Sequence, residues 1–284
     1  ERAIRQYRSF LAIWKKFSGS NNYKISQIDS MTIARFIDFT QDEEGYSSNT
    51  IKRWVGRLRF FILRSETFGV KTASDFQERV YVGKADDIMK PYLNVDEIDR
   101  IFNLDLSHDD SLDNIRDSFI IGVWSALRIS DFNRKLQLDN IDEDYINIQT
   151  TKTGSWVVVP LHPQVKKVLK KRAGNLPVKY SDKHFNEGIK VVCMLAGIDD
   201  VIKGKKFDGL KKRSVIGEYK KYELVSSHIC RRSFTTNLYG KISDDILADL
   251  GGWSDLSMMR HYVKRTKKES AEVLKQYWEK NLIK

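Results

Sequence analysis

The sequence predicts a mainly α-helical protein with a small β-sheet, an α+β fold arranged in two domains. Apolar residues recur at helical spacing through residues 1–69, whereas the later part of the chain mixes such patterns with runs of β-branched residues. A polar connection that ends at Pro91 separates the two regions. We therefore expect a helical domain at 1–82, a linker at 83–91, and a mixed domain with a C-terminal helical tail at 92–284.

The first domain is expected to contain helices over 1–17, 29–41 and 47–69. Asp29 or Ser30 can cap the second helix, and Gly69 is a plausible end for the third. The third helix has the clearest amphipathic pattern, with an apolar stripe at Ile51, Trp54, Val55, Leu58 and Ile62. Its other faces carry the basic residues Lys52, Arg53 and Arg57. Taken alone, such a face is more often a solvated surface, and the alternative is a helix laid against DNA phosphates.

The second domain is expected to hold one hairpin and several helices. The strands "YINIQ" and "SWVVVPL" flank the turn "TTKTG", which carries Lys152. A basic, strand-like segment at 201–225 contains Lys205 and Lys206, and it either follows a DNA strand or forms a solvated loop. Helices are expected at 94–104, with Asn94 as the cap, and at 113–127, 162–174, 181–197, 243–252 and the C-terminal segment.

Composition favours a polyanionic partner. The chain has 284 residues and a net charge of +11, which points to nucleic acid first and an anionic membrane surface second. The longest apolar run, 119–127, is too short to cross a membrane. Two cysteines exclude a disulfide framework and fit a reducing cytoplasm or nucleoid. The chain begins at Glu1 rather than at a methionine, so we expect an N-terminal piece to have been removed or left out.

The sequence gives little support for metal or nucleotide chemistry. No two of the five histidines stand at helical ligand spacing, and no pair of cysteines forms a zinc motif, so no metal is expected. Phosphate-binding glycine loops of the dinucleotide or nucleoside-triphosphate type are missing, and so is a serine-hydrolase elbow. We therefore expect no cofactor.

Basic residues at helix ends are the remaining candidates. In "SSHICRRSF", residues 226–234, Ser226 or Ser227 can cap a helix whose first turns carry His228 and Arg231 on one face. That arrangement suits an anion, although HxxR is also common by chance. Arg128 follows the apolar helix at 113–127, so it lies near the core and needs a carboxylate or a ligand anion as partner.

Together these motifs resemble the tyrosine recombinases, also called the phage integrase family. The order "LRISD" with Arg128, "TKTG" with Lys152, "HICR" with His228 and Arg231, "GW" with Trp253, and "HY" with Tyr262 matches the family's pattern. There are 24 residues from Arg128 to Lys152 and 31 from Arg231 to Tyr262, which fits the family's spacing. The chain departs from the pattern at Ala126, where glycine is common, and at Met258 and Met259, where smaller residues or threonine are common.

The resemblance implies a role for each residue. Tyr262 is expected to attack a DNA phosphodiester and form a 3′-phosphotyrosine, while Arg128 and Arg231 hold the non-bridging oxygens. Lys152 is expected to protonate the leaving 5′-oxygen, and His228 to accept or share the tyrosine proton. Trp253 would donate its indole N–H to the phosphate, and Asp131 would orient Arg128.

The resemblance also implies a fold and partners. It implies a helical core-DNA-binding domain and a catalytic domain that together form a C-shaped clamp around double-stranded DNA. A homo-tetramer on DNA is expected, with accessory DNA-bending proteins as further partners. The tail has an apolar stripe, at Ala271, Leu274, Tyr277 or Trp278, and Leu282, that either docks on a neighbouring subunit or packs on its own domain. A type IB topoisomerase and an inert DNA-binding module remain as alternative functions.

Overall fold

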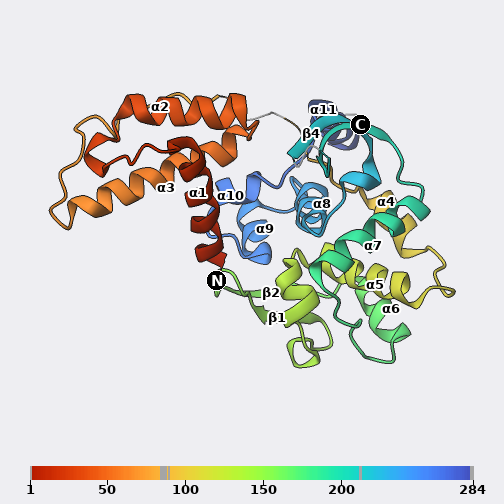
Figure 1. Ribbon diagram of the computed structural model, residues 1–284. Coiled ribbons are helices and arrows are strands. Elements are labelled where there is room, and N and C mark those ends of the chain that lie inside the picture. The colour runs from red at the N-terminus through yellow and green to blue at the C-terminus, as the bar shows by residue number, and fades with distance from the viewer. Residues whose placement is uncertain (1, 84–87, 89, 211–212, 282–284) are drawn as a thin grey trace. The chain divides into compact units, whose positions relative to one another are not determined.

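The computed structural model describes residues 2–83, 88, 90–210 and 213–281 (Figure 1). The chain forms two compact units, one of residues 1–87 with 207–214 and the other of residues 88–206 with 215–284. Both are built mainly from helices, and the described strands form two small two-stranded sheets. The α+β prediction is therefore confirmed. The functional domain limits expected from the sequence stay a prediction.

The first unit contains the three predicted helices, α1 (Arg2–Ser18), α2 (Ser30–Asp38) and α3 (Ser48–Glu66), with short helical turns at Ile25–Gln27 and Phe39–Glu43. Asp29 is the cap of α2, since its carboxylate accepts the N–H of Thr32 at 2.7 Å. The whole predicted stripe of α3 is buried, against an aromatic cluster that includes Phe10 and Phe36. The helix ends at Glu66, and Gly69 follows it with a φ of +75°.

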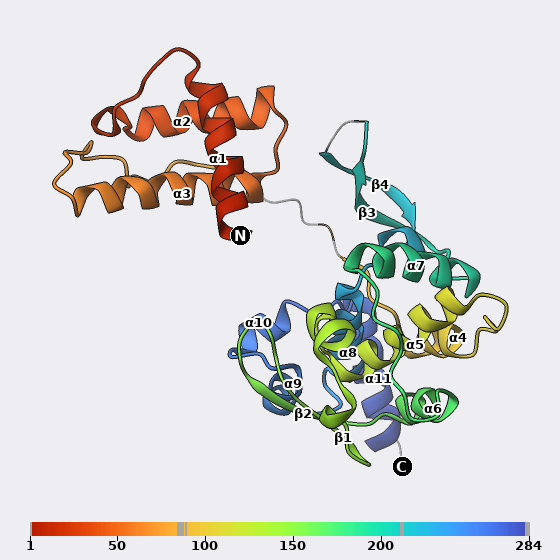
Figure 2. The same cartoon turned by 60° about the horizontal axis from the view of Figure 1, so that its bottom comes forward.

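The second unit is built around α5 (Asp110–Ser125), which packs on four other helices (Figure 2). These are α4 (Val95–Phe102), α6 (Pro163–Lys171), α7 (Asp182–Leu195) and α8 (His228–Leu238). Nearly every side chain of α5 beyond its first turn is buried, as expected for a central helix. Because α5 is surrounded, the residues that directly follow it are held close to the core.

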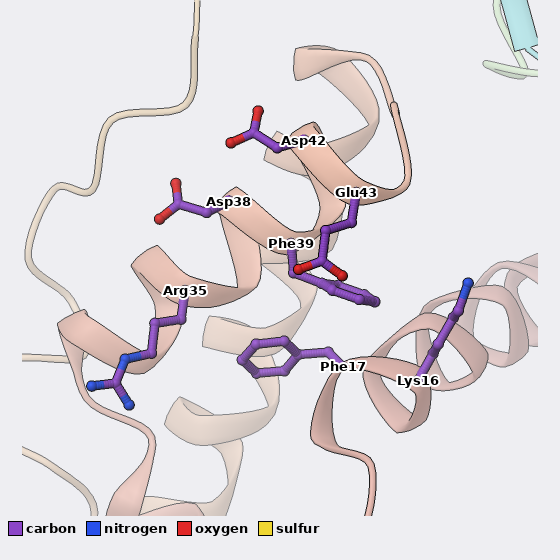
Figure 3. A pocket seen from close by; sticks show the side chains of 7 residues that line it. All are labelled: Lys16, Phe17, Arg35, Asp38, Phe39, Asp42 and Glu43. Carbon is purple, nitrogen blue, oxygen red and sulfur yellow. The ribbon is translucent and has the colours of Figure 1, made fainter.

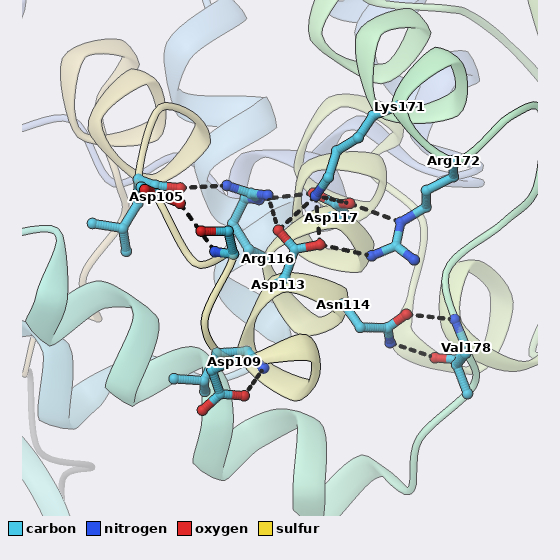
Figure 4. Close-up of polar contacts among 12 residues, drawn as sticks. Asp105, Asp109, Asp113, Asn114, Arg116, Asp117, Lys171, Arg172 and Val178 are labelled. Carbon is cyan, nitrogen blue, oxygen red and sulfur yellow. Dashed lines mark hydrogen bonds and ion pairs between the residues drawn. The ribbon is translucent and has the colours of Figure 1, made fainter.

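A network of charged side chains fixes α5 to its neighbours (Figure 4). Asp117 is almost fully buried, and it accepts from Arg116 Nε at 2.7 Å and from Arg172 Nε at 2.7 Å. Lys171 adds an ion pair with Asp117 at 3.0 Å, and Asp113 pairs with the same basic side chains. Arg116 also donates to the carbonyl of Leu104 at 2.6 Å, just beyond α4. The network thus ties together α5, the end of α6 and the segment after α4.

The predicted hairpin is present as β1 (Tyr145–Gln149) and β2 (Trp156–Pro160), paired antiparallel with Ile146 opposite Val159. Its side chains alternate between buried and exposed, so one face packs on the core. The basic segment forms β3 (Val201–Asp208) and β4 (Arg213–Lys220). Further short helical turns lie at Ser130–Lys135, Leu138–Asn140 and Lys221–Leu224.

The last part of the chain forms α9 (Asp244–Gly251), α10 (Leu256–Arg260) and α11 (Lys267–Asn281). The apolar stripe of α11 is partly exposed on the single chain at Leu274, Tyr277 and Trp278, and its docking on a neighbouring subunit stays a prediction. Leu282, which completes the predicted stripe, lies outside the described residues. Of the described helices, none combines the length and apolar composition that a membrane crossing requires.

Candidate active site

Arg231 is the most firmly anchored of the predicted catalytic residues. Its side chain is 1% exposed. Nη1 donates to the carbonyl of Ala126 at 2.7 Å, and Nη2 donates to the carbonyl of Gly251 at 2.9 Å. The guanidinium carbon also lies 4.0 Å from the centroid of a Trp253 ring. Arg231 therefore joins the C-terminal ends of α5 and α9 through α8.

The backbone at Ala126 is shaped for this contact. Ala126 follows α5 in the left-handed region, with a φ of +53° and a ψ of +11°. Glycine adopts this conformation more readily than alanine, which explains why the family favours glycine here. The left-handed residue ends the helix, and its carbonyl is the acceptor for Arg231 Nη1.

Tyr262 lies in a turn that packs on Trp253 and α8. The two aromatic rings are tilted, with centroids 5.2 Å apart, and the Arg231 guanidinium lies 5.2 Å from the Tyr262 ring. The hydroxyl of Thr236 donates to the Tyr262 carbonyl at 3.3 Å. Arg231, Trp253 and Tyr262 are thus brought together as the sequence motifs predict.

The two methionines ahead of the tyrosine behave differently from each other. Met259 is fully buried beside Trp253 and anchors α10, whereas Met258 is exposed. A side chain added at Gly251 would lie 1.7 Å from the Trp253 ring, so that glycine is required by the close approach of the indole. The larger side chain at Met259, which departs from the family pattern, is therefore packed in the core.

Arg128 lies just past α5, half-buried, and its Nη1 is buried without a partner in the described part of the chain. Asp131 was expected to orient it. The structure places Asp131 Oδ1 2.8 Å from the N–H of Thr151, which it accepts, and leaves Oδ2 without a partner among described residues. The carboxylate therefore tethers the β1–β2 turn. Its orienting role toward Arg128 stays a prediction.

Lys152 lies exposed on this tethered turn. The turn is closed by the N–H of Thr150, which donates to the Ser155 carbonyl at 2.8 Å, and by Gly154 with a φ of +69°. Within the described residues, Lys152 has no hydrogen bond or ion pair, so none joins it to Arg231 or Tyr262. The hairpin position is as predicted, whereas delivery of the ammonium to the site is not seen in the isolated chain.

His228 begins α8, as the sequence predicted, but neither serine caps the helix with its side chain. Ser227 already has helical φ and ψ, which turns its hydroxyl away from the free N–H groups, and its own N–H donates to Asn186 Oδ1 at 2.7 Å. Partial burial lowers the pKa of His228 below its ordinary value, and the charges of Arg232 and Arg231 act in the same direction. The imidazole is therefore neutral near pH 7 and able to accept a proton.

Three buried donors around this site have no acceptor in the described part of the chain. They are Arg128 Nη1, Arg231 Nε and Trp253 Nε1. Burial lowers the pKa of Arg231 to about 10, and the charge of Arg128 acts in the same direction, so Arg231 is still cationic at pH 7. Buried donors normally find partners, and two arginines rarely meet without an anion. The arrangement is that of an anion site beside a tyrosine.

The described residues contain no group of histidine, cysteine, aspartate and glutamate side chains that could hold a metal ion. Arg128 and Arg231 bring positive charge to this site. Arg232 and Thr236 were missed by sequence reasoning, although their spacing of four and eight residues from His228 places them on its face of α8.

The predicted DNA-contacting residues have mixed surroundings. Arg57 donates to the side-chain oxygen of Gln6 at 2.6 Å, so it ties α3 to α1, while Arg53 bonds back to Asn49 on its own helix. Lys52 is exposed, and Lys206 pairs with Glu223 at 2.6 Å. Lys205 has partners as well. Lys211 and Lys212 lie outside the described residues, and DNA contact by any of these side chains stays a prediction.

A cavity in the first unit has a lining of mixed charge (Figure 3). It has a volume of about 550 Å³, and its lining residues are Lys16, Phe17, Arg35, Asp38, Phe39, Asp42 and Glu43. Because carboxylates and basic side chains both border it, its charge does not favour a phosphate.

The comparisons with known proteins agree with this geometry. The model of the phage integrase family matches residues 91–269, a range that contains all six predicted catalytic residues. The chain belongs to the phage integrase family. No protein with a curated description matches the sequence significantly.

Solved structures of this family share the fold. A lambda integrase (75–356) dimer bound to a COC′ core site has a TM-score of 0.68 and 16% identity, covering 94% of this chain and 90% of that one. The Tn1549 transposon integrase with transposon right-end DNA has a TM-score of 0.63 and 12% identity, covering 100% and 94%. XerH recombinase on a palindromic difH substrate has a TM-score of 0.62 and 16% identity, covering 95% and 76%.

Proposed function

We propose that this protein is a site-specific DNA recombinase that integrates or excises a mobile element. The observation that carries the proposal is the set of buried donors without acceptors on Arg128, Arg231 and Trp253, gathered beside Tyr262. A phosphodiester supplies the anionic oxygens that these donors need. Membership of the phage integrase family supports the same chemistry.

The reaction is a transfer of one phosphodiester bond. The hydroxyl oxygen of Tyr262 attacks the phosphorus, a bond from phosphorus to the tyrosine oxygen forms, and the bond to the 5′-oxygen breaks. His228 takes the tyrosine proton, and Lys152 gives a proton to the leaving 5′-oxygen. Because the phosphotyrosine conserves the energy of the bond, rejoining to another 5′-hydroxyl needs no nucleotide cofactor.

Arg128 and Arg231 stabilise the extra negative charge of the transition state. Arg231 is held by two carbonyls before DNA arrives, and its free Nε is left for the phosphate. A donor fixed in advance need not reorganise during the reaction, so it is more effective than a solvated one. Trp253 stacks on the Arg231 guanidinium, and its buried indole N–H, which has no acceptor among the described residues, is a further donor for the phosphate.

Assembly on double-stranded DNA as a tetramer is part of the proposal. The exposed stripe on α11 needs a cover, and a neighbouring subunit would supply one. A solved lambda integrase tetramer bound to a Holliday junction, similar in fold to this chain, supports this arrangement. Leu274→Glu is expected to keep strand cleavage and to lose complete recombination, whereas loss of cleavage as well would argue for a role within the single chain.

A covalent trap tests the function. The protein is incubated with fragmented DNA from its source genome, quenched in detergent, and the protein-linked DNA is sequenced, with Tyr262→Phe as the matched control. One or two enriched sequences that are lost in the control would support a site-specific recombinase. Scattered tyrosine-dependent adducts would favour a type IB topoisomerase, and binding without any adduct would favour an inert DNA-binding module.

A further inference from the structure

Arg232, the neighbour of Arg231 on α8, is a buried cation without a counter-charge. Its residue is 7% exposed, its Nε is buried without a partner, and it forms no ion pair or hydrogen bond in the described part of the chain. The other two buried arginines differ from it. Arg116 pairs with Asp113 and Asp117, and Arg231 donates to two carbonyls. A buried charge is normally paired, so Arg232 requires an explanation.

The chain places a second cation on the same helix face. Thr236 stands one turn after Arg232, and its hydroxyl accepts the backbone N–H of Lys264 at 2.9 Å while donating to the Tyr262 carbonyl. The segment from Tyr262 to Lys264 therefore runs along the face that carries Arg232. Lys264 is half-buried, and it too has no ion pair among the described residues.

The electrostatics of this face are one-sided. Burial lowers the pKa of Lys264, and the charges of Arg232 and Lys90 act in the same direction. Burial also lowers the pKa of Arg232, to about 10. The strongest charges that act on neighbouring His228 are cationic as well. The fold holds these cations together against their repulsion, as an anion-binding site does.

We propose that Arg232 and Lys264 form a second phosphate subsite, which binds the DNA backbone phosphate next to the scissile phosphate on the cleaved strand. The inference rests on the proposed function, because it takes Tyr262 as the residue that reaches the scissile phosphate. Arg232 follows Arg231 on α8, and Lys264 is two residues from Tyr262, so the same two segments carry the residues of both sites. Holding two consecutive phosphates fixes the strand's rotation and aligns the bond for attack.

The salt dependence of DNA binding measures such contacts directly. Each phosphate contact that is lost reduces the slope of log Kd against log salt concentration by about 0.9. We would measure the anisotropy of a labelled duplex of arbitrary sequence between about 50 and 200 mM NaCl. The variants are Arg232→Met, Lys264→Met and Arg232→Lys, and Lys166→Met, an exposed lysine of α6 that pairs with Asp144, is the matched control.

The expected result is specific. Over this salt range, the loss of affinity should be about 3.5-fold smaller in Arg232→Met and in Lys264→Met than in the wild type. Arg232→Lys keeps the charge and should keep the wild-type slope, and so should the control. Unchanged slopes in both methionine variants would overturn the proposal, whatever their melting temperatures, since Lys264→Met tests the subsite even if Arg232→Met unfolds.

The covalent trap separates this inference from the function on which it rests. Adduct formation through Tyr262 with unchanged slopes would overturn the subsite and leave the recombinase function intact. Reduced slopes in a protein that forms no adduct would leave a phosphate subsite in a chain whose proposed catalysis is wrong.

Discussion

The face of α8 and the β1–β2 turn carry different groups of the proposed reaction. One group is buried and the other is exposed. On α8, Arg231 is buried, bonded to two carbonyls and stacked on Trp253. On the turn, Lys152 is exposed, and its neighbour Thr151 donates its N–H to Asp131. The groups that stabilise charge are fixed in the core, whereas the proposed proton donor is outside it.

This difference has a physical reason. Electrostatic stabilisation depends on donors that do not move when the transition state forms, and burial provides that rigidity. A general acid must instead approach one oxygen, lose a proton and recover it from water. A turn that is exposed to water suits that cycle of proton loss and recovery. The comparison predicts that changes on α8 affect both stability and activity, whereas changes on the turn affect activity alone.

The largest effect is expected for Lys152→Ala. Loss of the general acid should slow cleavage by about 10²–10⁴-fold, with an unchanged melting temperature because the side chain is exposed. A substrate with sulfur in place of the bridging 5′-oxygen should restore most of the rate, because a thiolate leaves without protonation. The rates would be measured by adduct formation on the captured site. A failure of sulfur to rescue the variant would contradict the assignment of Lys152 as the acid.

Lysine variants of Arg128 and Arg231 should both lose activity, but only one of them should lose stability. Arg128→Lys and Arg231→Lys should each slow adduct formation by about 10²–10³-fold, because a lysine offers no fork. Only Arg231→Lys should also destabilise the fold, by about 1–3 kcal/mol, since it leaves the carbonyl of Ala126 or Gly251 unpaired in the core. Thermal unfolding measures this difference. Equal losses of stability in both variants would contradict the claim that only Arg231 helps to hold the core together.

Asp117→Asn should lower the stability of the fold and leave the cleavage rate almost unchanged. Arg116 and Arg172 each pair with both Asp117 and Asp113, so the change removes one of their two carboxylates. Loss of this buried charge should cost about 3–5 kcal/mol of folding free energy. The cleavage rate per folded molecule should stay close to that of the wild type, because among the described residues Asp117 bonds to Arg116, Lys171 and Arg172 and not to the candidate site. Denaturant unfolding and adduct rates would be compared, with the exposed pair variant Asp144→Asn as control.

The smallest effect concerns the pH dependence of His228. Because its pKa is lowered in the folded protein from the ordinary 6.5, the unfolded chain binds a proton more readily. Its contribution to stability is therefore complete above pH 6.5 and is lost as the pH falls through the lowered pKa. His228→Asn should flatten the melting temperature below pH 6.5 relative to the wild type. A steeper fall in the variant would contradict the sign.

The sequence located most of the helices and the hairpin, whereas the site residues it named stay a prediction, and their bonding partners could not be read from it. Amphipathic spacing located α3 and the alternating strands located the β1–β2 hairpin, because these are local patterns. The bonds of Arg231 could not be foreseen, because its acceptors lie 105 and 20 residues away in the chain. Asp131 lies three residues from Arg128 in sequence, so we expected it to bond to Arg128. In the structure its carboxylate accepts the N–H of Thr151, beside Lys152.

The single measurement closest to the central claim is the chemical identity of the protein–DNA link. The trapped adduct would be digested with protease and nuclease, and the modified peptide would be sequenced by mass spectrometry. We predict one modified residue, Tyr262, joined to the 3′-phosphate of a nucleotide. Attachment at another tyrosine such as Tyr239, or through a 5′-phosphate, would contradict the assignment of the α8 face as the site of strand cleavage.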